Sequence, residues 1–354
     1  MFKHLVAAML AIGALDAPSV AGTAAAPALT LRQAVGQHMI FAYDGLQPPP
    51  ALRRRIERGE AAGVILFTRN VQSTGQARSV MRDLQAIRRP QGLRAPLIVM
   101  VDQEGGPVRR IPGAPARAAA SVTSVQQARA DGRAAARTLR SAGANMDLAP
   151  VADVGRPGAA LQRERRTYGS SSADVGRRAG AFADGLREGG VRATAKHFPG
   201  FGAAAVNTDN AAQRIGTSLS TLRSVDEEPF KRLIDAEIDA VMISTAVYPM
   251  LDDRPAAFSP PWIEGELRER LGFRGVSITD DLGTPAVAAY GSNRRRAVLA
   301  AQAGIDLPLF SASYNAGAQA AEGLLAAARD GRLEAAALRR GARRVLALRA
   351  RIPR

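Results

Sequence analysis

The chain has 354 residues, of which 46% are hydrophobic and 23% are charged, and it contains no cysteine. The missing cysteine excludes disulfide scaffolds, iron–sulfur clusters and thiol nucleophiles. Only three histidines occur, so a histidine-rich metal site is excluded, and a Ser-His-Asp triad would have to use His38 or His197.

The chain is strongly basic, with 48 Lys and Arg residues against 32 Asp and Glu residues and a formal net charge of +16. Only three of the basic residues are lysines. Such a field is expected to attract polyanions non-specifically, including anionic cell-wall polymers. Aromatic residues make up only 5% and do not alternate with basic residues, so no specific nucleic-acid partner is predicted.

The first residues have the order of a secretory signal peptide. A basic start at Lys3 precedes an apolar run over 5–15, and small residues follow up to Ala26. We therefore expect residues 1–26 to be a signal peptide and the mature protein to be extracytoplasmic, secreted or periplasmic. A disordered or helical N-terminal extension is the alternative. No segment is long and apolar enough to predict a membrane span.

Short apolar runs alternate with longer segments rich in Ala, Leu and Arg from Leu29 onward. The apolar runs predict strands at 38–43, 63–68, 96–101, 144–149, 191–196, 240–245, 275–280 and 304–309. The longer segments predict helices that include 75–88, 124–141, 173–189, 219–236 and 289–303.

Eight strands, most of them followed by a helix, predict an α/β fold with a parallel sheet wrapped by helices. Eight is also the number that closes a (β/α)8 TIM-type barrel, so residues 27–354 are expected to form one such domain. A doubly wound open sheet is the runner-up, but a Gly-rich phosphate turn after the first strand is missing. Segment 333–352 is expected to be the closing helix, with a solvated basic face; the alternative is a helix that binds a membrane surface or nucleic acid.

Polar residues follow several of these strands, at the end where barrel enzymes place their chemistry. Those that follow the strands are Asp102, Glu104, Arg110, Asp153, Arg166, Lys196, His197, Asp280 and Asp281. Asp280 shares one strand face with Val276 and Ile278, whereas Asp281 lies on the other face. If the apolar face points inward, Asp280 lies at the barrel mouth, where neighbouring basic groups keep it ionised.

Six segments in order resemble glycoside hydrolase family 3, in its single-barrel branch of β-N-acetylhexosaminidases. They are GVILFTRN, VDQEGGPVRRI, NMDLAPVADV, RRTYG, KHFPGFG and LGFRGVSITDDL. The resemblance implies a glycosidase that retains the anomeric configuration through a covalent glycosyl-enzyme. It implies a carbohydrate substrate, such as cell-wall glycan fragments, and no metal or organic cofactor.

The resemblance places Asp280 on the nucleophile. It also places Asp102, Arg110, Arg166, Lys196 and His197 on the positions that hold sugar hydroxyls. The alternative for the two arginines is a purely structural role, as ion-pair partners of Asp102 and Asp153.

One loop differs in sequence from the corresponding loop of this branch of the family. In that branch the loop ends in Asp-Ser-His, and its histidine is the acid/base. The matching residues here are Asn207-Thr208-Asp209. Asp209 is one candidate acid/base, because carboxylates serve that role in most retaining glycosidases. Another group, such as Glu104 or a side chain of a partner chain, is the second candidate; sugar binding without cleavage is the third interpretation.

The leading hypothesis is therefore an exo-acting β-glycosidase that uses Asp280 as nucleophile. A catalytically impaired sugar-binding relative at the cell wall is the alternative, and a polyanion-binding surface protein is a third hypothesis based on charge alone. The sequence predicts no particular oligomeric state.

Overall fold

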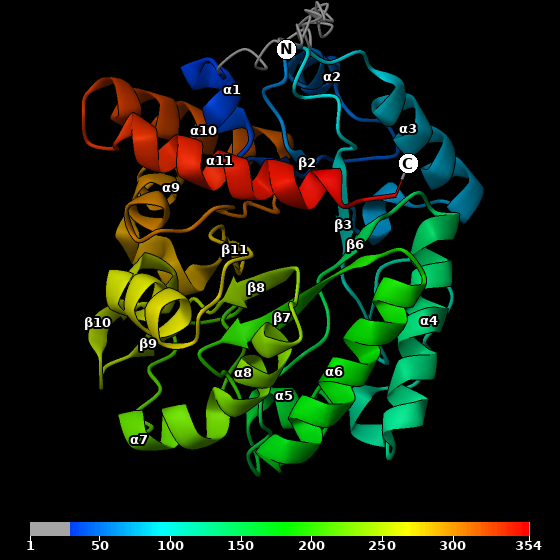
Figure 1. The fold of residues 1–354 in the computed structure, drawn as a ribbon, viewed down its shortest axis with the longest axis vertical. Helices are drawn as coiled ribbons and strands as arrows, with labels where there is room; N and C mark the ends of the chain where they lie inside the picture. The colour runs from blue at the N-terminus through cyan, green and yellow to red at the C-terminus, as the bar shows by residue number, and fades with distance from the viewer. Residues whose placement is uncertain (1–28, 354) are drawn as a thin grey trace, which may run out of the picture.

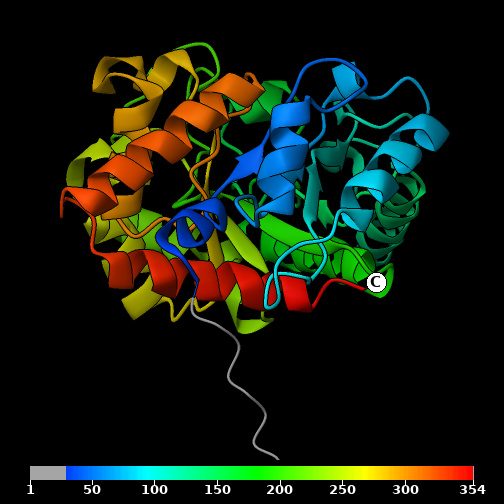
Figure 2. The same cartoon turned by 90° about the horizontal axis from the view of Figure 1, so that it is seen from above.

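A computed structural model describes residues 29–353, whose centre is a seven-stranded parallel sheet in the order β1-β2-β3-β6-β7-β8-β11 (Figure 1). The strands are β1 (Ile40–Phe41), β2 (Gly63–Ile65), β3 (Ile98–Val101), β6 (Met146–Asp147), β7 (Arg192–Phe198), β8 (Ala240–Ile243) and β11 (Val276–Thr279). All six neighbouring pairs are parallel. The sheet is curled, and the helices lie around its outside (Figure 2).

Seven of the eight predicted strands are present as strands, each within or close to its expected range. The eighth, expected at 304–309, forms only isolated parallel bridges, from Leu307 to Ile278 and from Phe310 to Phe41. Pro308 lies between the bridging residues and has no N–H group, which shortens regular pairing in this segment. The architecture is thus an α/β fold with a curled parallel sheet.

Two antiparallel hairpins lie outside the main sheet. One joins β4 (Gln103–Gly105) to β5 (Val108–Arg109), directly after β3. The other joins β9 (Val247–Tyr248) to β10 (Asp252–Pro255), after β8. Both follow the carboxyl ends of central strands and were not expected from the sequence.

The helices are α1 (Leu31–Gly36), α2 (Pro50–Glu57), α3 (Thr74–Ala86), α4 (Val125–Ser141), α5 (Ala160–Arg163), α6 (Ser172–Glu188), α7 (Leu219–Thr221), α8 (Glu228–Asp235), α9 (Asn293–Gln302), α10 (Tyr314–Arg329) and α11 (Ala335–Ala350). Several long helices begin after a serine whose hydroxyl accepts a backbone N–H, as Ser73 does for α3 and Ser124 for α4. The helix expected at 219–236 is instead three short pieces, with π-helical geometry over Leu222–Asp226 before α8.

Two apolar clusters stabilise the sheet. The inner cluster gathers inward-facing strand residues such as Ile98, Met146 and Ile278, and the larger outer cluster fills the space between sheet and helices. Helices α4 and α6 approach closely because glycines lie at their contact. A Cβ on Gly132 would come within 2.2 Å of the carbonyl oxygen of Phe182.

Helix α11 covers the amino-terminal end of the strands. The inner cluster includes Val345 and Leu348 of this helix and Ile352, which lies just beyond its end. Arg339 and Arg340 of the same helix are exposed. The expected closing helix with a basic outer face is therefore present. The carboxyl end of the sheet is left for the polar residues described next.

The expected signal peptide lies outside the described residues. Within 29–353, no helix is both long and apolar enough to cross a membrane.

Candidate active site

A polar pocket of about 360 Å³ opens at the carboxyl end of the sheet. All seven residues proposed from the sequence line it: Asp102, Arg110, Arg166, Lys196, His197, Asp209 and Asp280. They come from the ends of β3, β7 and β11 and from intervening loops. The fold thus gathers residues that are up to 178 positions apart, a separation set by Asp102 and Asp280.

An irregularity in β7 brings two consecutive residues to this pocket. Lys196 is paired with Met242 and Phe198 with Ile243, so His197 is an extra residue in the strand. Side chains of a regular strand alternate between faces, and a bulge changes that alternation locally. Lys196 and His197 therefore both line the pocket, although they are neighbours in the chain.

Lys196 and Arg166 form a buried ionic network with the carboxylates of the β3 side. The Lys196 Nζ atom lies 2.7 Å from both Asp102 Oδ1 and Glu104 Oε1. Arg166 makes two parallel contacts with Glu104, of 2.8 and 2.9 Å, and a third of 3.0 Å with Glu164. Paired donors of this kind fix the direction of each side chain.

The electrostatics keep this network ionised. Burial alone would raise the pKa of Glu104, but the charges of Arg166 and Lys196 outweigh burial and hold that pKa well below its ordinary value. Burial would lower the pKa of Lys196, but Asp102 and Glu104 raise it overall. Glu104 is therefore unsuited to donate a proton, which argues against it as the acid/base.

His197 is oriented by a fully buried carboxylate. Its Nδ1 atom lies 2.7 Å from Asp153 Oδ2, and its backbone N–H donates to the same oxygen at 3.1 Å. The other oxygen of Asp153 accepts the backbone N–H of Phe201, whose ring meets the imidazole edge-on at 5.8 Å between centroids. Asp153 thus fixes the His197 ring and, with it, the loop that follows β7.

His38, the other histidine considered for a triad, does not lie in this pocket. Its ring nitrogens lie 2.6 and 2.8 Å from the carbonyl oxygens of Asp306 and Leu338. These contacts give His38 a structural role near α11.

Asp280 follows β11 on the inward face. Val276 and Ile278 belong to the inner apolar cluster, so Asp280 continues their face into the pocket, as the strand parity predicts. The Thr208 hydroxyl donates to Asp280 Oδ2 at 3.3 Å. Asp281 accepts hydrogen bonds from Gly283 and Ser311, but it also lines the pocket and does not turn fully away.

Asp209 lies at the exposed rim of the same pocket, on the loop after β7. Partial burial of its carboxyl raises its pKa, and the negative charges of Asp280 and Asp281 raise it further. His197 and Arg166 oppose this shift without cancelling it. The carboxyl of Asp209 is therefore held closer to the pKa range of a proton donor than an ordinary aspartate is.

The contacts of Arg110 and Arg166 differ from those that a purely structural role predicts, which are ion pairs with Asp102 and Asp153. Arg166 does form ion pairs, but with Glu104 and Glu164 rather than with Asp102 or Asp153. The Nε of Arg110 is buried and has no hydrogen-bond partner among the described residues. Arg110 lines the pocket, and neither Asp102 nor Asp153 forms an ion pair with it.

Sequence reasoning did not assign Glu104, Asp153 or Thr208 a place in the binding machinery. The sequence suggested Glu104 only as a second candidate acid/base and Asp153 only as a possible partner of the arginines, and no residue pattern indicates which cations they contact. Thr208 is the middle residue of the Asn207-Thr208-Asp209 loop, and no residue pattern marks it as a contact of Asp280. The contacts depend on how separate loops meet, which residue spacing does not specify.

Comparison with known proteins identifies the family. Residues 14–348 match the glycosyl hydrolase family 3 N-terminal domain. An uncharacterized secreted glycosyl hydrolase of Arthroderma benhamiae is 38% identical, over 93% of this chain and 96% of its own length. A β-hexosaminidase of Alkalilimnicola ehrlichii is 37% identical, over 70% of this chain and 72% of its own.

Solved structures agree with this relationship. The β-N-acetylhexosaminidase of Beutenbergia cavernae superposes with a TM-score of 0.83 at 33% identity, covering 91% of this chain and 99% of that one. A family 3 β-N-acetylglucosaminidase of Paenibacillus sp. gives a TM-score of 0.85 at 32% identity. That match covers 92% of this chain and 63% of the Paenibacillus chain. The chain therefore belongs to glycosyl hydrolase family 3 and is a glycoside hydrolase.

Proposed function

We propose that the protein is a retaining, exo-acting β-glycosidase of the β-N-acetylhexosaminidase kind. The observation that carries the proposal is that Asp280 and Asp209 line one pocket with a fixed set of sugar-binding groups. The carboxylate of Asp280 supplies the nucleophile, and the raised pKa of Asp209 supplies the proton donor.

The reaction has two steps. In the first, an Asp280 oxygen forms a bond to the anomeric carbon while the glycosidic bond breaks, and the Asp209 carboxyl gives its proton to the departing oxygen. In the second, Asp209 takes a proton from water, the water oxygen bonds to the anomeric carbon, and the Asp280 ester bond breaks. Asp209 regains its proton and Asp280 its charge, and the product keeps its anomeric configuration.

The remaining pocket residues hold the sugar. Asp102 accepts from hydroxyls, and Arg110, Arg166 and Lys196 donate to them. The ion pairs of Lys196 and Arg166 are already formed, so these donors keep one direction before substrate enters. The pocket volume of about 360 Å³ is at the lower end for small-ligand sites, which suits one terminal sugar and exo-acting cleavage.

The described chain is proposed to act outside the cytoplasm. The secreted relative of Arthroderma benhamiae supports this, as do the signal-peptide features of residues 1–26. Residues 27–354 would then form the mature catalytic domain, acting on glycan fragments of cell walls. The bridges made by Leu307 and Phe310 support closure of the sheet into a (β/α)8 barrel.

A catalytically impaired sugar-binding protein is the second candidate. It is favoured by Asp209 standing where this branch of the family carries the acid/base histidine. The intact environment of Asp280 favours cleavage, because binding alone does not require a nucleophile.

The test compares release of nitrophenol from 4-nitrophenyl and 2,4-dinitrophenyl glycosides of β-N-acetylglucosamine and β-glucose. Asp280→Asn is expected to lower turnover of every substrate by at least about 10³-fold. Asp209→Asn is expected to lower turnover by about 10²–10⁴-fold on 4-nitrophenyl glycosides but little on the better leaving group. Unchanged turnover in Asp280→Asn would overturn the assignment, and sugar binding without release would establish the second candidate.

A further inference from the structure

A large cavity in the described chain is distant from the catalytic pocket and is lined by arginines. It has a volume of about 1140 Å³ and lies at the amino-terminal end of β3 and β6, near Pro96 and Asn145. Six arginines line it: Arg78, Arg82, Arg89, Arg94, Arg137 and Arg140. No acidic residue lines it. We call this cavity the arginine groove.

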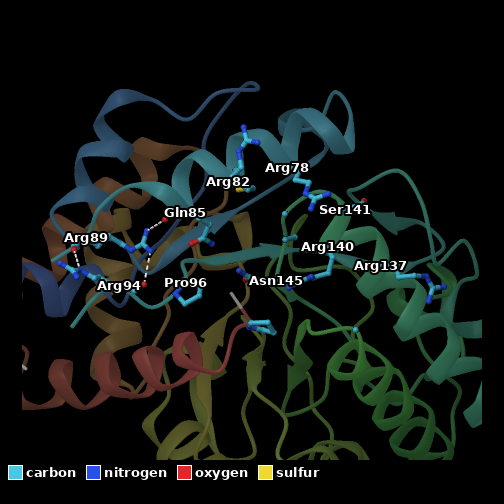
Figure 3. Close-up of a pocket in the computed structure, with 15 residues that line it drawn as sticks. Arg78, Arg82, Gln85, Arg89, Arg94, Pro96, Arg137, Arg140, Ser141 and Asn145 are labelled. Atoms are coloured by element: carbon cyan, nitrogen blue, oxygen red, sulfur yellow. Dashed lines mark hydrogen bonds between the residues drawn. The ribbon is translucent and has the colours of Figure 1, made fainter. Parts of the chain in front are cut away.

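Helices α3 and α4 and the loops that follow them form most of its walls (Figure 3). Arg78 and Arg82 lie four residues apart on α3, and Arg137 and Arg140 lie three apart on α4, so each pair projects from one helix face. Figure 3 shows Arg89 and Arg94 toward one end of the groove and Arg137 toward the other. The positive charge therefore extends along the whole groove.

These arginines make almost no ion pairs with carboxylates. Among the described residues, Arg82 alone of the six makes an ion pair, with Asp83 at 3.6 Å. Arg78, Arg82, Arg94, Arg137 and Arg140 are exposed. The groove thus offers guanidinium groups that remain available for an anion.

The floor of the groove carries further positive charge in a fixed arrangement. Arg89 is only 7% exposed and donates to the carbonyl oxygens of Gln85, Ile87 and Leu93, at 3.1 to 3.3 Å. Fully buried Arg349 donates to the carbonyl oxygens of Leu93 and Pro96, next to the groove. Burial lowers the pKa of Arg349 to about 9, and the nearby charge of Arg89 contributes to that shift.

We propose that the arginine groove binds an acidic glycan, a carbohydrate chain that carries carboxylates on successive sugars. Guanidinium groups bind carboxylates through two parallel hydrogen bonds, which the rows on α3 and α4 can repeat along a chain. The spacing of Arg78 and Arg82, about 6 Å along the helix axis, suits a polymer with regularly spaced charges.

The lining favours a glycan over other polyanions. No aromatic residue lines the groove, so it lacks the stacking surfaces that single-stranded nucleic acids use. None of the exposed large apolar side chains, Leu46, Val125, Val206 and Met250, lines it, so it lacks the apolar groups that insert into a membrane.

The groove and the catalytic pocket lie at opposite ends of the sheet. A polymer held in the groove therefore leaves the catalytic pocket open to a separate sugar chain. This role as an attachment site does not depend on the proposed catalytic mechanism.

The test measures binding of a galacturonic acid hexamer to the full chain by calorimetry at about 0.15 M NaCl, where screening weakens non-specific attraction. The groove variant is Arg78→Gln/Arg82→Gln/Arg137→Gln/Arg140→Gln. The matched control is Arg54→Gln/Arg339→Gln/Arg340→Gln/Arg343→Gln. Both variants remove four positive charges, and all eight arginines except Arg82 make no ion pair among the described residues.

The groove variant is expected to bind at least about tenfold more weakly than the wild type, and the control within about twofold. A second groove variant with lysines at the same four positions keeps the charge but removes the bidentate hydrogen bonding of the guanidinium groups. It is expected to bind with an affinity between those of the wild type and the glutamine variant. The two groove variants and the control variant should all hydrolyse a small aryl glycoside at the wild-type rate, which verifies that they are folded.

Equal losses in the groove and control variants would overturn the proposal in favour of a non-specific field. Failure of the wild type to bind at this salt concentration would also overturn it. So would equal affinity for a neutral glucose hexamer, or tighter binding of a single-stranded oligonucleotide or anionic vesicles.

Discussion

At the scale of single residues, the loop over Asn207-Thr208-Asp209 places an aspartate at the proposed proton-donor position. Histidine titrates near neutral pH without help, whereas an ordinary aspartate has a pKa near 3.9. Asp209 lies where partial burial and two neighbouring carboxylates, Asp280 and Asp281, raise its pKa. The negative cluster that contains the proposed nucleophile Asp280 therefore favours the protonated form of Asp209, as its proposed role requires.

The pH dependence of kcat/KM should show this arrangement. A general acid must be protonated in the free enzyme, so activity is expected to fall as pH rises through the pKa of Asp209. Because that pKa is raised, the fall should begin above the range of an ordinary aspartate but leave an acidic optimum. A pH series with 4-nitrophenyl β-N-acetylglucosaminide measures it.

Asp281→Asn provides the control for this pH profile. Removing the Asp281 charge removes one cause of the raised pKa, so the fall in activity should move to lower pH. In Asp209→Asn the fall should disappear. An unchanged profile in both variants would contradict Asp209 as the acid.

Glu104 is expected to contribute more to stability than its neighbour Glu164. Glu104→Gln leaves the buried cations Lys196 and Arg166 without their shared carboxylate, which should cost about 3–5 kcal/mol of unfolding free energy. Glu164→Gln removes a partner whose side chain is 37% exposed and should cost at most about 1 kcal/mol. Urea unfolding measures both, and equal costs would argue against the network.

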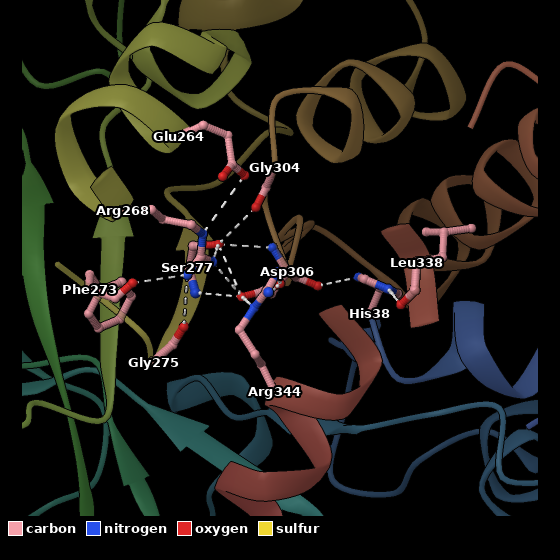
Figure 4. Close-up of polar contacts among 10 residues, drawn as sticks. All are labelled: His38, Glu264, Arg268, Phe273, Gly275, Ser277, Gly304, Asp306, Leu338 and Arg344. Carbon is pink, nitrogen blue, oxygen red and sulfur yellow. Dashed lines mark hydrogen bonds and ion pairs between the residues drawn. The ribbon is translucent and has the colours of Figure 1, made fainter. Parts of the chain in front are cut away.

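At the scale of elements, Asp306 joins four parts of the chain near the amino-terminal end of the sheet (Figure 4). Its carboxylate lies 2.9 Å from Arg268 and 2.6 Å from Arg344 of α11, and it accepts the N–H of Ser277 in β11 at 3.0 Å. Its carbonyl oxygen contacts His38. This network attaches the irregular segment 304–309 to the sheet where regular strand pairing is missing.

Asp306→Asn is therefore expected to lower the unfolding free energy by about 3–5 kcal/mol, because it leaves two partly or fully buried arginines without their anion. Asp330→Asn is the control, since its pair with Arg332 is more than half exposed and should cost below about 1 kcal/mol. Denaturant unfolding gives both values. Activity per folded molecule should not change, because this network lies away from the catalytic pocket.

The repeated pattern of strands and helices was predictable because apolar runs and helical periodicity are local. The inward direction of Asp280 was predictable for the same reason, from strand parity alone. The helix expected at 219–236 and the strand expected at 304–309 are interrupted, and their prolines Pro229 and Pro308, which lack an N–H group, were the local signals that indicated it. Simultaneous exposure of Lys196 and His197 to the pocket depends on a bulge against β8, which no local pattern in β7 indicates.

At the scale of the whole molecule, positive charge is paired in one pocket and largely unpaired in another. At the catalytic pocket Lys196 and Arg166 are paired with Asp102, Glu104 and Glu164, and carboxylates outnumber cations in the lining. In the arginine groove the cations are not matched. The net charge of +16 is thus partly a concentrated surface feature rather than a uniform excess.

This excess should make stability depend on salt in a characteristic direction. A chain of net charge +16 repels itself in the folded state, and added salt screens that repulsion. Tm is therefore expected to rise between about 0.02 and 0.3 M NaCl, because repulsion outweighs the surface ion pairs that salt also weakens. The groove variant with four glutamines should show a smaller rise, since it lacks four closely spaced charges. The control variant has the same net charge as the groove variant, and three of its substitutions lie within five residues of α11, so its rise should also be smaller than that of the wild type. A Tm that falls with salt in all three proteins would mean that attractive ion pairs, not net repulsion, dominate the electrostatics of the fold.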